Sequence, residues 1–195
     1  HMSQLRKLVL ASASPRRAEL LTQIGVKFRV RPADLDESPL AGEQPEALVT
    51  RLAAEKAKAA AQIVNDTEGG VILASDTVVV LDNQALGKPA DFADAAAMLG
   101  ALSDRTHQVM TAVSLLDGTR QETICVTTQV HFGPLSATQI ARYWATGEPV
   151  DKAGAYGIQG IAGQFVKSIE GSYSAVVGLP LYETVQLLQE FGVIE

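Results

Sequence analysis

Apolar and polar residues along this chain follow two different periods, which predict that strands and helices alternate. Short apolar runs bounded by turn-forming residues are typical of buried strands, and apolar residues three or four positions apart are typical of helices. Strands are predicted at residues 8–10, 26–30, 71–81, 107–116, 121–132 and 165–169. Helices are predicted from Pro15 to near Gly25, from Pro45 to the stretch 65–70, from Asp91 to Leu102, from Ser136 to near Gly147, and from Leu181 to Phe191. In the second helix the expected apolar positions are Leu48, Leu52 and Ile63.

A hairpin is predicted around Asp117 and Gly118, because this dipeptide separates two long strand patterns. An antiparallel hairpin within an otherwise alternating order makes the sheet mixed. The predicted fold class is therefore α/β, with a mixed central β-sheet flanked by helices. No internal repeat or apolar-poor linker divides the chain, so a single domain is expected over residues 3–195. His1 and Met2 are expected to be the remnant of a tag.

The charge balance argues against two classes of partner. The 195 residues carry a formal net charge of −6, whereas a protein that binds nucleic acid or an anionic membrane needs a basic face. Apolar residues make up 47% of the chain, yet no apolar run reaches the length of a membrane span, so a soluble globular protein is expected. Small anionic ligands remain compatible with this composition if positive charge is concentrated locally.

Cysteine and histidine usage limits the redox and metal chemistry. Cys125 is the only cysteine and is expected to be a small core residue, which points to a reducing, cytoplasmic location. No signal-peptide pattern precedes the first predicted strand. The native histidines, His107 and His131, do not form a zinc-type spacing. Any metal is therefore expected to be a hard cation bound by oxygen atoms.

The stretch "VLASASPRRAELL", residues 9–21, predicts an anion-binding site. Ser14 is a suitable N-cap and Pro15 suits the first helical position, so Arg16 and Arg17 fall in the first turn. Positive charges there lie beside the positive end of the helix dipole, which is unfavourable unless an anion binds. A strand, a small-residue turn and a helix N-terminus also present backbone N–H groups suited to phosphate. The alternative is an ordinary solvated pair of arginines.

Asp76 interrupts the apolar run "VILASDTVVVL", residues 71–81, which otherwise reads as a strand buried on both faces. An unpaired buried carboxylate is costly, so Asp76 needs hydrogen-bond donors, a metal or solvent at a cleft. The alternative is an aspartate in a tight turn between two strands. Thr77 is β-branched and fits an ordinary strand position equally well.

Two lysines and a glycine-rich segment complete the candidate chemistry. Lys56 lies on an alanine-rich helix, and Lys88 follows the Asp76 strand across a short turn, in "LGKP". Taken singly, each is typical of a solvated surface charge; together with Arg16 they would form a phosphate clamp. The segment 151–163 contains four glycines, which suit either close approach of the backbone to a ligand or a tight connection. Gln159, within it, carries both a donor and an acceptor.

The motifs "ASASPRR", "ASDTVV" followed by "LGKP", and "DKAGAYGIQG…GSYSAVVGLPLYET" closely resemble those of the Maf family of nucleotide pyrophosphatases. The resemblance covers essentially the whole chain, and "YGIQG" looks like the branch that acts on dTTP and UTP. It implies an elongated, two-lobed α/β fold with a cleft, as in inosine triphosphatases, and a homodimer. It also implies hydrolysis of a nucleoside triphosphate to the monophosphate and pyrophosphate, with Mg²⁺ or Mn²⁺ as cofactor.

The resemblance further implies roles for particular residues. Asp76 corresponds to the proton acceptor, and the specificity set corresponds to Arg16, Thr77 and Gln159. The implied phosphate-binding residues are Ser14, Arg16, Lys56 and Lys88, and the implied metal ligands are Glu37 and Asp76. The amide of Gln159 suits uracil or thymine, because it can accept from N3–H and donate to the adjacent carbonyl. The C5 position lies off that edge, so C5-modified uridine triphosphates are expected substrates too.

Two other functions fit the same motifs. One is the branch of the family that hydrolyses 7-methyl-GTP. The other is a nucleotide-binding regulator of cell division that does not turn its ligand over. The acidic residue at position 76 favours an enzyme over a regulator alone.

Overall fold

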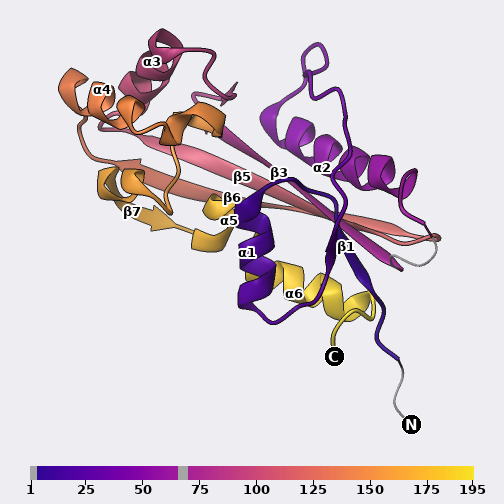
Figure 1. The fold of residues 1–195 in the computed structure, drawn as a ribbon. Coiled ribbons are helices and arrows are strands. Elements are labelled where there is room, and N and C mark those ends of the chain that lie inside the picture. Colours follow the sequence, from indigo (N-terminus) through magenta and orange to yellow (C-terminus); the bar gives the residue numbers. More distant parts are fainter. Residues whose placement is uncertain (1–3, 66–69) are drawn as a thin grey trace.

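The computed structural model describes residues 4–65 and 70–195, so His1 and Met2 and most of the stretch 65–70 lie outside the described residues. These residues form one seven-stranded mixed sheet in the order β2-β1-β3-β5-β6-β7, with β4 paired to β3 (Figure 1). The strands are β1 Leu8–Leu10, β2 Arg29–Val30, β3 Val71–Leu81, β4 Gln84–Leu86, β5 Thr106–Leu116, β6 Gln121–Phe132 and β7 Val166–Glu170. The predicted α/β class with a mixed sheet is confirmed.

Six α-helices and three 3₁₀ turns accompany the sheet within the described ranges. The helices are α1 Pro15–Gln23, α2 Pro45–Ala61, α3 Phe92–Leu102, α4 Ala137–Ala145, α5 Tyr173–Val177 and α6 Leu181–Glu190. The 3₁₀ turns are η1 Glu148–Asp151, η2 Ala153–Ala155 and η3 Ile161–Phe165. None of the described helices is long and apolar enough to cross a membrane.

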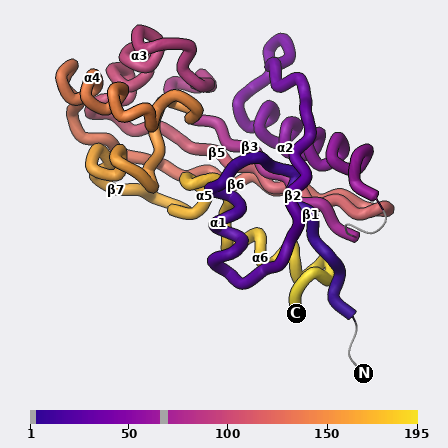
Figure 2. Tube along the Cα trace, viewed as in Figure 1, coloured from indigo at the N-terminus to yellow at the C-terminus, as the bar shows by residue number. Residues whose placement is uncertain are grey.

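The long strands β3, β5 and β6 join two groups of helices into an elongated body. Helices α3 and α4 lie near β7 at one end, whereas α1, α2 and α6 surround β1 and the start of β3 at the other (Figures 1 and 2). Strand β1 runs parallel to β2 and β3, whereas the pairs β3–β5, β5–β6 and β6–β7 are antiparallel. The two-lobed form therefore rests on one continuous sheet.

Helix α2 can lie close to the sheet because its inner face is made of small residues. Ala57 and Ala60 pack with Ala74 in one cluster, and Val49 and Ala53 pack in a second cluster around Val78 and Val80. Side chains on a strand alternate between faces, so residues 74, 76 and 78 of β3 all face α2. Asp76 therefore lies between the two apolar clusters, directly beneath the helix.

Helix starts were predicted well because their capping residues lie next to them in sequence. The Ser14 side chain accepts a hydrogen bond from the Arg17 backbone N–H at 3.4 Å, and Asp91 accepts one from Asp94 at 2.8 Å. Ser136 forms a capping box with Gln139. The predicted hairpin is also present, as β5 paired with β6.

Several predicted details were wrong. The strand expected at 26–30 is reduced to Arg29–Val30, since Val26 and Phe28 instead pack onto the core from a loop. Helix α2 ends at Ala61, which leaves Ile63 outside it and 55% exposed. Strand β4 was missed because it is only three residues long, and its turn depends on Asp82 and Asn83 adopting positive φ. Helix α5 was missed because it is only five residues long.

Candidate active site

A cleft of about 800 Å³ is lined by segments from across the sequence. They include the β1–α1 turn, the loop after β2, helix α2, the middle of β3, the loop after β4 and the glycine-rich segment. Every residue expected to belong to the site lines this one cleft: Ser14, Arg16, Glu37, Lys56, Asp76, Thr77, Lys88 and Gln159. The residues that the motifs single out, cationic and acidic alike, therefore share one cavity.

Lys56 joins two carboxylates at the centre of the cleft. Its ammonium lies 2.7 Å from Asp76 Oδ1 and 3.0 Å from Glu37 Oε1. Asp76 is only 9% exposed, and this burial raises its pKa above the usual aspartate value, although Lys56 and Arg17 partly oppose the shift. The Asp76 carboxylate is therefore a stronger base than a solvated aspartate.

The same geometry fits a divalent metal. The described part of the chain contains no cluster of three His, Cys, Asp or Glu side chains. Two carboxylates nevertheless converge on one cation, the Lys56 ammonium. Mg²⁺ commonly binds through one or two carboxylates and completes its coordination with water and substrate phosphates. Glu37 and Asp76 are suited to hold such an ion once a phosphate ligand is present.

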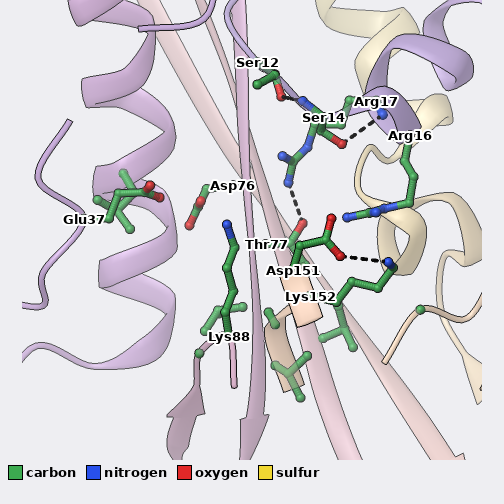
Figure 3. A pocket seen from close by; sticks show the side chains of 18 of the residues that line it. Ser12, Ser14, Arg16, Arg17, Glu37, Asp76, Thr77, Lys88, Asp151 and Lys152 are labelled. Atoms are coloured by element: carbon green, nitrogen blue, oxygen red, sulfur yellow. Dashed lines mark hydrogen bonds and ion pairs between the residues drawn. The ribbon is translucent and has the colours of Figure 1, made fainter. Parts of the chain in front are cut away.

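The two arginines of "SPRR" differ sharply. Arg17 is fastened to the protein: its Nε donates to the Gly178 carbonyl at 2.7 Å, and Nη2 donates to Thr77 Oγ1 at 2.9 Å. Burial lowers the pKa of Arg17 to about 10, so it keeps its charge at neutral pH. Arg16, by contrast, makes no hydrogen bond or ion pair with any residue that the structure describes, and points toward Asp151 (Figure 3). The surface-pair interpretation is therefore wrong for Arg17.

Thr77 and Asp76 project to opposite faces of β3. The Thr77 hydroxyl bonds to Arg17 and lies 2.9 Å from the Thr111 hydroxyl, on the face that carries α1 and α5. Thr77 therefore lines the cleft beside Arg17, to which it is hydrogen-bonded. Asp76 lies on the opposite face of β3, toward α2 and Lys56. The tight-turn interpretation of Asp76 is wrong, because β3 runs unbroken from residue 71 to 81.

The remaining predicted residues surround the central carboxylate. Ser14 lies at the start of α1, where its side chain caps the helix. Lys88 is exposed, and its ammonium points toward Asp76 from the loop after β4 (Figure 3). Gln159 is exposed at the cleft in the glycine-rich segment.

Four charged residues of the cleft were not among the predicted site residues: Arg17, Asp34, Asp151 and Lys152. Lys152 donates to Asp151 at 3.0 Å and to the Glu148 carbonyl at 2.8 Å. For the last two, the "DK" pair at the start of the glycine-rich segment was the available signal, since charges beside flexible backbone are common at sites. No local pattern distinguishes Arg17 from Arg16, because both lie in the first turn of one helix.

Comparisons with known proteins find relatives that match nearly the whole chain. A family profile described as "Maf-like protein" matches residues 7–191. A dTTP/UTP pyrophosphatase of Vibrio vulnificus (strain YJ016) is 55% identical over 187 residues, which cover 96% of this chain and 100% of the relative. The protein of that name from Pseudoalteromonas atlantica is 57% identical over 186 residues, covering 95% and 97% of the two chains. The one from Shewanella oneidensis is 54% identical over 192 residues, covering 96% and 99%.

Proposed function

The chain belongs to the Maf family, and from this membership we propose that it hydrolyses dTTP and UTP, with C5-modified uridine triphosphates, to the monophosphate and pyrophosphate. The relatives named dTTP/UTP pyrophosphatase support the substrate, because they match nearly the whole chain. The observation that carries the chemistry is the convergence of Asp76 and Glu37 on Lys56, in a cleft that also holds Arg16 and Lys88. This arrangement suits a polyanion bound together with a hard cation.

Six residues form what we name the phosphate end of the cleft: Ser14, Arg16, Glu37, Lys56, Asp76 and Lys88. Arg16 and Lys88 would neutralise charge that grows on the leaving pyrophosphate. Lys56 would exchange its carboxylate partners for phosphate oxygens when the substrate binds. The Ser14 turn would add backbone N–H groups at the start of α1.

Asp76 is the proposed base of the reaction. It orients a water molecule and takes its proton, while the water oxygen bonds to the α-phosphorus and the bond to the bridging oxygen breaks. The electron pair of that bond leaves with pyrophosphate. Glu37 and Asp76 would hold Mg²⁺ or Mn²⁺, which would neutralise phosphate charge and polarise the water.

Residues 157–162, which we name the base loop, carry the proposed recognition of the pyrimidine. The Gln159 amide accepts from N3–H and donates to a carbonyl of uracil or thymine. Cytosine reverses part of this pattern, so a fixed amide discriminates against it. Arg16 and Thr77 are the other proposed specificity residues, Thr77 acting through its contact with Arg17.

The test is to measure initial rates of pyrophosphate release from all common nucleoside triphosphates, 5-methyl-UTP and 7-methyl-GTP, with Mg²⁺, Mn²⁺ or chelator. We expect dTTP and UTP to be the best of the common substrates and chelator to abolish the reaction. In ¹⁸O-water the label should appear in the monophosphate; label found only in pyrophosphate would refute attack at the α-phosphorus. A preference for 7-methyl-GTP would place the protein in the other branch, and binding without turnover would indicate a regulator.

The proposal also covers the domain organisation, the oligomeric state and the cellular location of the protein. Residues 3–195 are proposed to act as one domain, because a single sheet connects both groups of helices. A cytoplasmic homodimer is proposed from the family resemblance and from the lone Cys125. Light scattering coupled to size-exclusion chromatography would measure the oligomeric state.

A further inference from the structure

The base loop contacts a pair of side chains that lie behind it, Tyr143 of α4 and Glu148 at the start of η1. Tyr143 is 2% exposed, and its ring packs edge-on against Phe165 with the ring centres 5.3 Å apart. Its hydroxyl donates a hydrogen bond to Glu148 Oε2. We name Tyr143 and Glu148 the clamp.

The clamp receives backbone N–H groups from both ends of the base loop. The Gly157 N–H donates to the Tyr143 hydroxyl at 3.1 Å. The Ile161 and Ala162 N–H groups donate to the two carboxylate oxygens of Glu148, at 2.9 Å and 3.3 Å. Gln159 lies between these attachment points, so its backbone is held from both sides.

In the clamp, Glu148 is favoured as a carboxylate and Tyr143 as a neutral phenol. Burial opposes ionisation of Glu148, but the hydrogen bonds from Tyr143 and the loop outweigh it and lower the pKa of this carboxyl below its ordinary value. Burial and the neighbouring carboxylate raise the pKa of the Tyr143 phenol. Tyr143 therefore stays a donor to Glu148, and its oxygen stays an acceptor for Gly157.

One glycine of the loop is required by this packing. A Cβ at Gly160 would collide with the Glu148 carboxylate, which is itself held in place by hydrogen bonds from Tyr143, Ile161 and Ala162. A side chain at Gly160 would therefore push the loop away from the clamp. Part of the glycine content of "YGIQG" is thus explained by the clamp rather than by contact with a ligand.

We propose that Tyr143 and Glu148 are positioning residues, which fix the base loop so that the Gln159 amide discriminates uracil and thymine from cytosine. The inference rests on the proposed function, since it assigns the clamp a role in choosing the base. If the loop were held at one end only, the Gln159 amide could rotate or shift and form hydrogen bonds with cytosine as well. The preference for uracil and thymine over cytosine would then fall, while phosphate binding stayed unchanged.

The experiment measures the ratio of kcat/KM for UTP over CTP in Tyr143→Phe, with inorganic triphosphate as a competitive probe that lacks a base. We expect the ratio to fall about tenfold, the factor that corresponds to losing one hydrogen bond. The inhibition constant of triphosphate should change less than about twofold, because the probe contacts only the phosphate end. Tyr182→Phe is the matched control, since Tyr182 is 74% exposed.

Two further variants keep the test decisive. Gly160→Ala and Glu148→Gln should lower the same ratio, and in a Gln159→Ala background Tyr143→Phe should lower it no further. A preference for UTP in the unmodified protein that survives in all three clamp variants would overturn the inference alone. An unmodified protein without that preference would overturn the proposed function as well.

Discussion

The phosphate end and the base loop of the cleft are held together in different ways. At the phosphate end, charged side chains come from segments far apart: Lys56 and Asp76 are 20 residues apart, and neighbouring Arg17 reaches Thr77 across 60. The base loop is held through Tyr143 and Glu148, which lie 14 and 13 residues from the backbone groups they bind. One region uses charge assembled by the fold, and the other uses short-range hydrogen bonds to backbone.

This difference matches what each region has to do. The ammonium of Lys56 contacts two carboxylates, and in the proposed function it would exchange both for phosphate oxygens when the substrate binds. A base-reading amide discriminates only if its orientation is fixed beforehand. The hydrogen bonds from Gly157, Ile161 and Ala162 to the clamp hold the base loop from both ends, as the proposed role of Gln159 requires.

The largest expected effect is at the phosphate end. Asp76→Asn should lower kcat for UTP by about 10³-fold, because the base is lost while the side-chain shape is kept. Affinity for inorganic triphosphate, measured without a divalent metal, should be retained, since no cationic side chain is removed. Pyrophosphate release measures the rate, and Asp82→Asn, at an exposed surface pair with Arg105, is the control. Unchanged kcat in Asp76→Asn would show that the charge assembly serves binding only.

The stability of the protein should depend on pH through His107, which contacts Tyr156, the residue that precedes the base loop. His107 is fully buried, its Nε2 lies 2.6 Å from the Tyr156 hydroxyl, and burial lowers its pKa from 6.5 to about 4. Between these values the unfolded state binds the proton and the folded state does not. The stability that neutral His107 contributes is therefore present above pH 6.5 and lost as pH falls toward 4, by up to about 3 kcal/mol.

Urea denaturation between pH 7 and 4 checks this prediction. His107→Gln should flatten the slope of the free energy of unfolding against pH in that window. Equal slopes in the unmodified protein and His107→Gln would mean that His107 is not held neutral.

A smaller effect is expected at the base loop itself. Gln159→Glu should lower kcat/KM for UTP about 30-fold, since a carboxylate cannot donate to the pyrimidine carbonyl. Inhibition by inorganic triphosphate separates this loss from simple repulsion of the phosphates. Gln164→Glu, an exposed position in η3, adds the same charge nearby. If both variants lost UTP turnover equally, the recognition role of Gln159 would have to be abandoned.

The smallest effect distinguishes the two adjacent arginines. Arg17→Lys should lower the free energy of unfolding by about 1–2 kcal/mol, because a lysine cannot reproduce both the Gly178 and Thr77 hydrogen bonds. Arg16→Lys should change it by less than about 0.5 kcal/mol and act on substrate affinity instead. Urea denaturation of both variants provides the measurement. The reverse order of stability would contradict the assignment of Arg16 to the substrate.

The sequence alone determined the α/β class, the long strands, the starts of the helices and the residue types of the site. These follow from apolar periodicity, capping residues such as Ser14 and Ser136, and the cost of burying an unpaired Asp76. The residues that the motifs single out do line one cleft.

Only the tertiary structure decided which groups face one another. Whether Arg16 or Arg17 is left unpaired depends on Gly178 and Thr77, and the pairing of Lys56 with Asp76 depends on how closely an alanine-rich helix approaches β3. The clamp was equally hidden, because Tyr143 and Glu148 become partners of the base loop only once the chain has folded back. Periodicity and capping act over a few residues, whereas electrostatic and packing partners are set by distances in space.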